Sequence, residues 1–171
     1  MKSKTAAGFV PNFAAGGLKS QDRTEPPIGA KVTLELIRKF GVDETAWVAD
    51  VVFDDLLDWN EWFIRKRLLP PLNLVALGTY NDQNQQAGNM QDARYESGLD
   101  NSPMYDGEFY NSTSGCSLTE SGCGLMQLYD VGMSSMFVQE CFALANLSRI
   151  IGRPAALTQA LLDRGNAMSA K

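Results

Sequence analysis

The sequence contains the stretch Arg94-Tyr95-Glu96-Ser97-Gly98-Leu99-Asp100-Asn101-Ser102-Pro103-Met104-Tyr105-Asp106. Three carboxylates, two tyrosines and an arginine stand here beside a glycine and a proline, and no apolar period runs through them. A segment of this kind between apolar helical segments is typical of a loop that carries binding or catalytic groups, and we do not expect it to fill a core. The same residues also suit a turn or a helix start, because short polar side chains bond to nearby backbone and proline fixes φ. Local chemistry alone favours the turn.

The apolar residues on both sides of this stretch predict an all-α chain of about four long helices with long functional loops. A period near 3.6 residues, bounded by Gly and Pro, places the helices at about 27–40, 45–68, 131–151 and from 154 onward. The second helix carries two apolar lines, and a helix with two apolar faces is expected to lie between two layers. Asp43 or Thr45 is expected to cap it, and Pro70-Pro71 to end it.

The remaining segments are predicted to be irregular. Residues 1–27 are expected to be irregular, with ordered loop at 10–13 and 19–27. Residues 72–93 are expected to form a loop with one short strand, and 107–125 an exposed insertion. The largest basic cluster, Arg65-Lys66-Arg67, falls at a predicted helix end, where cations complement the helix dipole.

The composition is that of an ordinary globular domain. The chain has 171 residues, 44% of them hydrophobic and 20% charged. Its net charge of −5 argues against nucleic acid or an anionic membrane as a partner. The sequence shows neither the apolar core of a signal peptide nor a membrane-spanning run, and it does not settle the compartment.

The sequence has no histidine, which excludes Ser-His-Asp and Cys-His catalysis and every histidine-based metal site. Acid–base chemistry is then left to carboxylates, Tyr, Lys or Cys. Cys141 lies on an apolar helix face and is expected in the core, whereas Cys116 and Cys123 either pair across a Gly/Ser/Thr-rich segment or remain thiols.

Several segments together resemble glycoside hydrolase family 63, the processing α-glucosidases and mannosylglycerate hydrolase-like enzymes, and more distantly the trehalases. They occur in the family's order: Val10-Pro11-Asn12, Asp22-Arg23-Thr24-Glu25-Pro26-Pro27, the helix with Trp59 and Trp62, Glu96-Ser97-Gly98-Leu99-Asp100-Asn101-Ser102-Pro103, and Tyr129-Asp130-Val131-Gly132. The Glu96–Pro103 match is specific, and the others would be weak alone.

The resemblance implies an (α/α)6 barrel of helical hairpins, of which residues 1–171 would form one partial catalytic domain. It implies inverting, metal-independent hydrolysis of an α-linked glucosyl or mannosyl substrate, without a cofactor, and makes Asp100 the general acid. The family's general base is a Glu that no residue of this sequence matches, so we expect the chain to be inactive alone and to need the rest of the barrel as its partner. Candidate sugar contacts are Arg23, Glu25, Trp59, Trp62, Arg94, Glu96, Gly98, Asn101, Tyr105 and Asp130.

Several of these residues have alternative interpretations. Trp59 and Trp62 suit core packing at least as well as sugar stacking, and Asp130 suits a helix N-cap. The family more often has Gln where Glu25 stands, which puts an amide contact there in doubt. Glu96 and Asp106 are the neighbours expected to raise the pKa of the acid. The rival functions are a non-catalytic carbohydrate-binding remnant of the same fold and a helical interaction module.

Overall fold

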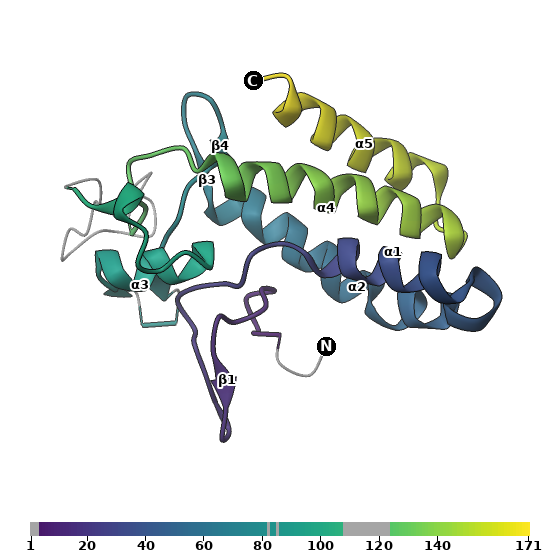
Figure 1. Cartoon of the computed structure of the whole chain (residues 1–171), viewed down its shortest axis with the longest axis horizontal. Helices are drawn as coiled ribbons and strands as arrows, with labels where there is room; N and C mark the ends of the chain where they lie inside the picture. Colours follow the sequence, from purple (N-terminus) through teal and green to yellow (C-terminus); the bar gives the residue numbers. More distant parts are fainter. Residues whose placement is uncertain (1–3, 82, 85, 108–123) are drawn as a thin grey trace.

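The computed structural model describes residues 4–81, 83–84, 86–107 and 124–171. The described chain is predominantly helical, as predicted (Figure 1). Its α-helices are α1 (Gly29–Phe40), α2 (Val42–Lys66), α3 (Met90–Arg94), α4 (Val131–Ile150) and α5 (Ala155–Ser169). Six two-residue strands form three antiparallel pairs: β1 (Ala14–Ala15) with β2 (Leu18–Lys19), β3 (Leu68–Leu69) with β4 (Leu74–Val75), and β5 (Tyr80–Asn81) with β6 (Gln86–Ala87).

The four long helices form two antiparallel hairpins that lie side by side (Figure 1). Gly41, at a φ of 94° that favours glycine, joins α1 directly to α2. Gly152 and Pro154 separate α4 from α5. Because α4 contacts α1, α2 and α5, it is the central helix of the bundle.

The core fills the space between α2 and α4. Phe53, Leu56 and Phe63 of α2 and Phe137 and Leu144 of α4 are almost completely buried, and the rings of Phe63 and Phe137 lie 5.8 Å apart. Each such side chain contributes about 1.5–3 kcal/mol by its removal from water. Cys141 is buried in the same core, as predicted.

The helix limits differ from the prediction mainly at the start of α2. The helix begins at Val42, directly after Gly41, and no side chain caps it. The expected cap at Asp43 or Thr45 was wrong: the Thr45 hydroxyl bonds instead to the carbonyl of Gly41 within the helix, at 2.6 Å.

The expectation that α2 lies between two layers is not met along its first half. Val51, on the second apolar line, is 67% exposed, and Trp47 is 66% exposed. Farther along, Leu57 and Ile64 of the same line are partly buried against the core. Among the described residues, nothing covers the outer side of the first half of α2.

The stretch 94–106 was expected to be a loop that stays out of the core. It has no long helix or strand, but several of its side chains are buried, so the second part of this expectation was wrong. Residues 95–97 and 103–105 form 3-10 turns, and Arg94, Glu96, Ser97 and Tyr105 are buried. Residues 72–93, expected to be a loop with at most one strand, hold three strands and the start of α3.

Most of the expected exposed insertion, with Cys116 and Cys123, lies outside the described residues. No helix in the described part of the chain is long and apolar enough to cross a membrane.

Candidate functional site

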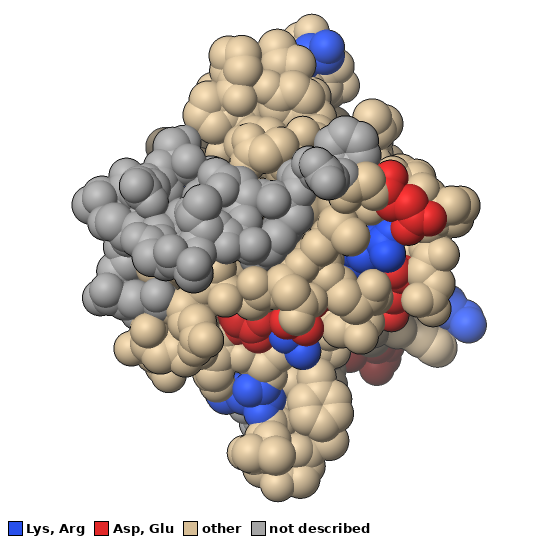
Figure 2. Space-filling model, turned by 90° about the vertical axis from the view of Figure 1, so that its left-hand side faces the viewer, with Lys and Arg blue, Asp and Glu red and all other residues tan. Residues whose placement is uncertain are grey.

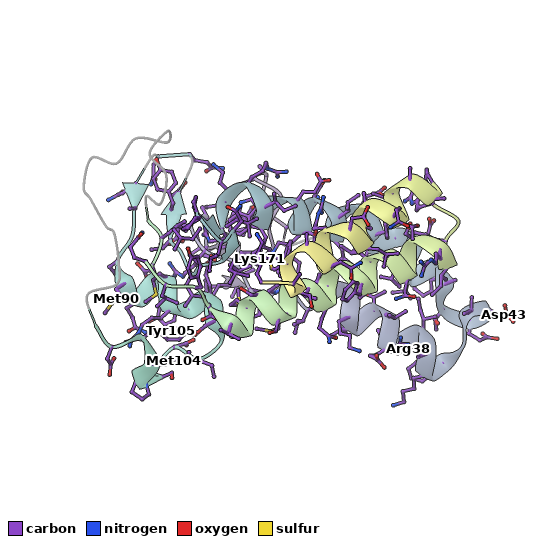
Figure 3. All side chains as sticks on the ribbon, turned by 90° about the horizontal axis from the view of Figure 1, so that it is seen from above. Arg38, Asp43, Met90, Met104, Tyr105 and Lys171 are labelled. Carbon is purple, nitrogen blue, oxygen red and sulfur yellow. The ribbon has the colours of Figure 1, made fainter. Side chains whose placement is uncertain are left out.

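The candidate residues come together at one end of the helical bundle. Figure 1 shows α3 and the short strands at this end. Figure 3 shows Met90, Met104 and Tyr105 there, whereas Arg38 and Asp43 mark the α1–α2 turn at the opposite end. The long helices therefore serve as a frame for this end.

The N-terminal segment folds back on itself to reach this end. The Asn12 N–H donates to the Arg23 carbonyl at 3.2 Å, and the Glu25 N–H donates to the Val10 carbonyl at 2.9 Å. Residues 10–25 are thus an ordered loop, as expected, and β1 and β2 form its projecting tip (Figure 1). The loop brings Arg23 and Glu25 to the site.

The carboxylate of Glu96 lies at the centre of this end and is completely buried. Arg67 donates to it from Nε and Nη2, both at 2.8 Å, and the backbone N–H groups of Thr24 and Gly78 donate to it at the same distance. Glu96 was expected to bind sugar or to influence Asp100, but its oxygens are occupied by these four donors. It holds the N-terminal loop, the end of α2 and the segment at Gly78 together.

Tyr105 and Asp130 are also engaged within the protein. The Tyr105 hydroxyl donates to Asp130 Oδ2 at 2.6 Å, while Asp130 Oδ1 accepts from the Met133 N–H at 2.7 Å as the N-cap of α4. Burial and the bond to Asp130 raise the pKa of Tyr105 to about 12. The N-cap interpretation of Asp130 is confirmed, and the buried tyrosine hydroxyl is not presented to a ligand.

Trp59 and Trp62 are core residues in this structure. They are 4% and 3% exposed, and Trp62 packs on Phe9 with ring centroids 4.6 Å apart. The indole N–H of Trp59 donates to Thr24 Oγ1 at 2.7 Å. The faces of both indole rings are covered by protein. This agrees with core packing, the alternative to sugar stacking that the sequence left open.

Arg23 and Arg94 are paired with carboxylates. Arg23 contacts Asp22 at 2.8 Å and Asp92 at 3.4 Å, and its guanidinium lies 5.3 Å from the centre of the Tyr95 ring. Arg94 is largely buried and contacts Asp106 at 2.5 Å. Asp106 is thereby held by a cation, Arg94, which opposes its negative charge.

Asp100, Gly98 and Asn101 lie where the segment 94–106 reaches the surface. Gly98 has a φ of 69°, and a Cβ at this position would stand 3.8 Å from Pro26 Cγ, so the two loops lie near each other. Asp100 and Glu25 are half-buried, and Asn101 is exposed. Burial, and secondly the charge of Asp100, raise the pKa of Glu25.

Two positioning contacts were not foreseen from the sequence. Gln91 Nε2 donates to the Asp100 carbonyl at 3.3 Å, and Asn12 Nδ2 donates to the Tyr95 carbonyl at 3.0 Å. Asn12 belongs to one of the family-like segments, which could have drawn attention to it. Gln91 lies in the segment predicted to be a loop, and nothing in its pattern pointed to Asp100.

Figure 2 shows this end of the molecule, where small groups of acidic and basic side chains lie against one another in a mostly uncharged surface. In the part of the chain that the structure describes, no group of His, Cys, Asp and Glu could hold a metal ion. None of the candidate residues lines the hollow of about 500 Å³ beside α4, whose walls include Leu74, Val131, Val138 and Met168.

Comparisons with family models, with curated proteins and with solved structures each found no match.

Proposed function

We propose that the chain carries the proton-donor half of an inverting glycoside hydrolase of the family 63 kind, with Asp100 as the general acid. The observation that supports this most is the setting of Asp100 within the Glu96–Pro103 motif. Asp100 is half-buried where the loop reaches the surface, and its carboxylate has no hydrogen-bond partner among the described residues. The buried Glu96 fixes the base of the same loop.

Inversion requires two carboxyl groups with different tasks. One protonates the leaving oxygen, while the other, roughly 6.5–9.5 Å away, activates a water on the opposite face of the sugar. We assign only the first task to this sequence, because none of Glu96, Asp106, Glu108 and Glu120 matches the motif of the family's base. The proposed substrate is an α-linked glucosyl or mannosyl compound, a class that rests on the resemblance.

The proposed architecture is part of an (α/α)6 barrel. The two adjacent antiparallel helical hairpins support it (Figure 1). Apolar side chains at four-residue intervals along the outer side of α1 also support it, since further helices of a barrel would cover them: Ile28, Val32, Leu36 and Phe40 are 40–55% exposed. Trp47 and Val51 of α2 add to this uncovered surface.

The test is sugar binding mapped by NMR, with α-linked glucosyl and mannosyl disaccharides as probes. We expect shifts at residues 23–25 and 98–101, a weaker response in Asp100→Asn, and an unchanged response in Asp163→Asn, which alters an exposed carboxylate on α5. Hydrolysis of an aryl α-glycoside should stay at background, because no residue of this sequence matches the family's general base.

Other outcomes contradict the proposal. No sugar-induced shift at either loop would favour the helical interaction module. Sugar binding in a longer chain that also carries the family's base, without any cleavage, would favour a carbohydrate-binding remnant. Turnover by these 171 residues well above background would show that the base lies among them.

A further inference from the structure

Two side chains of α3 reach the loop that carries Asp100. Gln91 Nε2 donates to the Asp100 carbonyl at 3.3 Å, and Arg94 Nη2 donates to the Ser102 carbonyl at 3.3 Å. The two side chains are three residues apart in the helix, which places them on the same face. They therefore hold the loop by two backbone carbonyls, and one of these belongs to Asp100 itself.

Arg94 also fixes the orientation of the Gln91 amide. Arg94 Nη1 donates to Gln91 Oε1 at 3.4 Å. Because a guanidinium has only donors, it takes the oxygen of the amide and leaves the NH2 group for the Asp100 carbonyl. Arg94 is 8% exposed and is held in turn by Asp106. The Gln91 amide thus acts toward Asp100 as a donor, and its partner on the other side is itself fixed.

Few other contacts hold Asp100 in place. Among the described residues, its carboxylate has no hydrogen-bond partner, and Gln91 is the only side chain that bonds to its backbone. A further support lies one residue earlier, where the Leu99 N–H donates to Ser97 Oγ at 2.9 Å. The position of the Asp100 side chain therefore depends on the bond between its own carbonyl and Gln91.

We propose that Gln91, oriented by Arg94, is a positioning residue for the proton donor Asp100. The inference rests on the proposed function, because it concerns the same reaction. In that reaction Asp100 gives its proton to the leaving oxygen, which keeps the electron pair of the broken C–O bond, and the carboxylate then regains a proton from water. The transfer requires the acid within about 2.6–3.2 Å of that oxygen, and an error of about 1 Å can slow such a step about 100-fold. Gln91 contacts the backbone of the acid and neither the substrate nor the proton.

The test is ¹⁵N NMR relaxation of the whole chain, which measures the order of each backbone N–H group. In the wild type we expect order parameters near about 0.85 at residues 99–102, as in rigid backbone. Gln91→Leu and Gln91→Glu resemble glutamine in size but lack its N–H donor, so we expect these values to fall below about 0.6. The matched control is Gln139→Glu on the exposed surface of α4, which should change none of them.

The two variants differ in charge, so a loss of order in both assigns the effect to the missing donor. If one variant fails to fold, the other still decides. Unchanged order at residues 99–102 would refute the role of Gln91, and so would a loss confined to Gln91→Glu, which would assign it to the added charge. A loss of order that extends over α4 and α5, with a lower midpoint of urea unfolding, would also refute it, because Gln91 would then support the whole fold.

A second readout is catalytic and requires a longer chain with hydrolytic activity. Gln91→Leu should lower kcat for an unactivated α-glycoside by about 10- to 100-fold with little change in KM, since the contact acts on the proton transfer. Hydrolysis of an α-glycosyl fluoride, whose leaving group needs no proton, should change much less. Equal losses on both substrates would refute the role.

The relaxation measurement separates this inference from the proposed function, since it requires neither sugar nor turnover. Sugar binding at the two loops with unchanged order at residues 99–102 would refute only the role of Gln91. Loss of order in the variants together with a failure of sugar binding would uphold the hold of Gln91 on the loop and overturn the glycosidase proposal.

Discussion

Arg67 and Glu96 form an ion pair inside the protein, with two hydrogen bonds of 2.8 Å and side chains that are 2% and 0% exposed. The guanidinium also lies over the ring of Trp62, with 4.4 Å between Arg67 Cζ and the ring centre. Neither charge contacts solvent appreciably, so each depends on the other for compensation.

Replacement of Arg67 by Met should destabilise the fold by about 3–5 kcal/mol, because it leaves a buried carboxylate without its cation. Urea unfolding followed by circular dichroism measures this. The control is Arg65→Met, two residues earlier, where an exposed guanidinium lies 3.8 Å from Glu61; the expected cost there is about 0.5 kcal/mol or less. Equal effects of the two substitutions would show that the buried pair has no special importance.

Glu140 should make stability depend on pH. Its buried carboxyl accepts hydrogen bonds from the Ala30 and Lys31 N–H groups at 2.6 and 3.1 Å, but burial outweighs these bonds and raises its pKa from 4.5 to about 7. Since the folded state binds this proton more tightly than the unfolded state, its contribution is complete below pH 4.5 and is lost as the pH rises through 7. The loss amounts to about 3 kcal/mol.

The measurement is the free energy of unfolding of the wild type and of Glu140→Gln between pH 4.5 and 8. The wild type should lose stability relative to the variant over this range, because the amide does not titrate. A difference that stays constant with pH would contradict the prediction.

The Tyr105–Asp130 bond predicts an order of stability among variants. Asp130→Ala removes the cap of α4 and leaves the Tyr105 hydroxyl without its acceptor, so we expect a loss of about 1–3 kcal/mol. Asp130→Asn retains an acceptor oxygen and should cost less.

The phenol of Tyr105 should ionise only near its pKa of about 12 in an absorbance titration, and Tyr105→Phe should remove that late step. Ionisation of all tyrosines near pH 10 would contradict the buried bond.

The three tryptophans should differ in their access to solvent. Trp47 is 66% exposed, whereas Trp59 and Trp62 are almost fully buried. Acrylamide should therefore quench one component of the fluorescence efficiently, and Trp47→Phe should abolish that component. If efficient quenching persists in the variant, Trp59 or Trp62 is accessible and could stack against a sugar.

The helices were predictable because their signals are local. The apolar period, Gly41 and Gly152, and the prolines after α2 and before α5 mark the four long elements within short windows of sequence. The end of α4 was placed within one residue of the prediction, and the Asp130 cap was among the interpretations weighed.

The site was less predictable because its contacts join residues far apart in the chain. Arg67 was assigned to the helix dipole by its position at a helix end, but its partner lies on another segment. Glu96 and Asp100 belong to one motif, yet the first is completely buried and the second only partly, a difference that a polar stretch without periodicity does not encode.

The buried Glu96 also has a consequence for the order of folding. Its bonds reach back 72 residues to Thr24 and 29 residues to Arg67, so they form only after large loops have closed, at a cost in chain entropy. The α1–α2 and α4–α5 hairpins need only near neighbours along the chain. We therefore expect the hairpins to assemble first and the end that carries Asp100 to consolidate last.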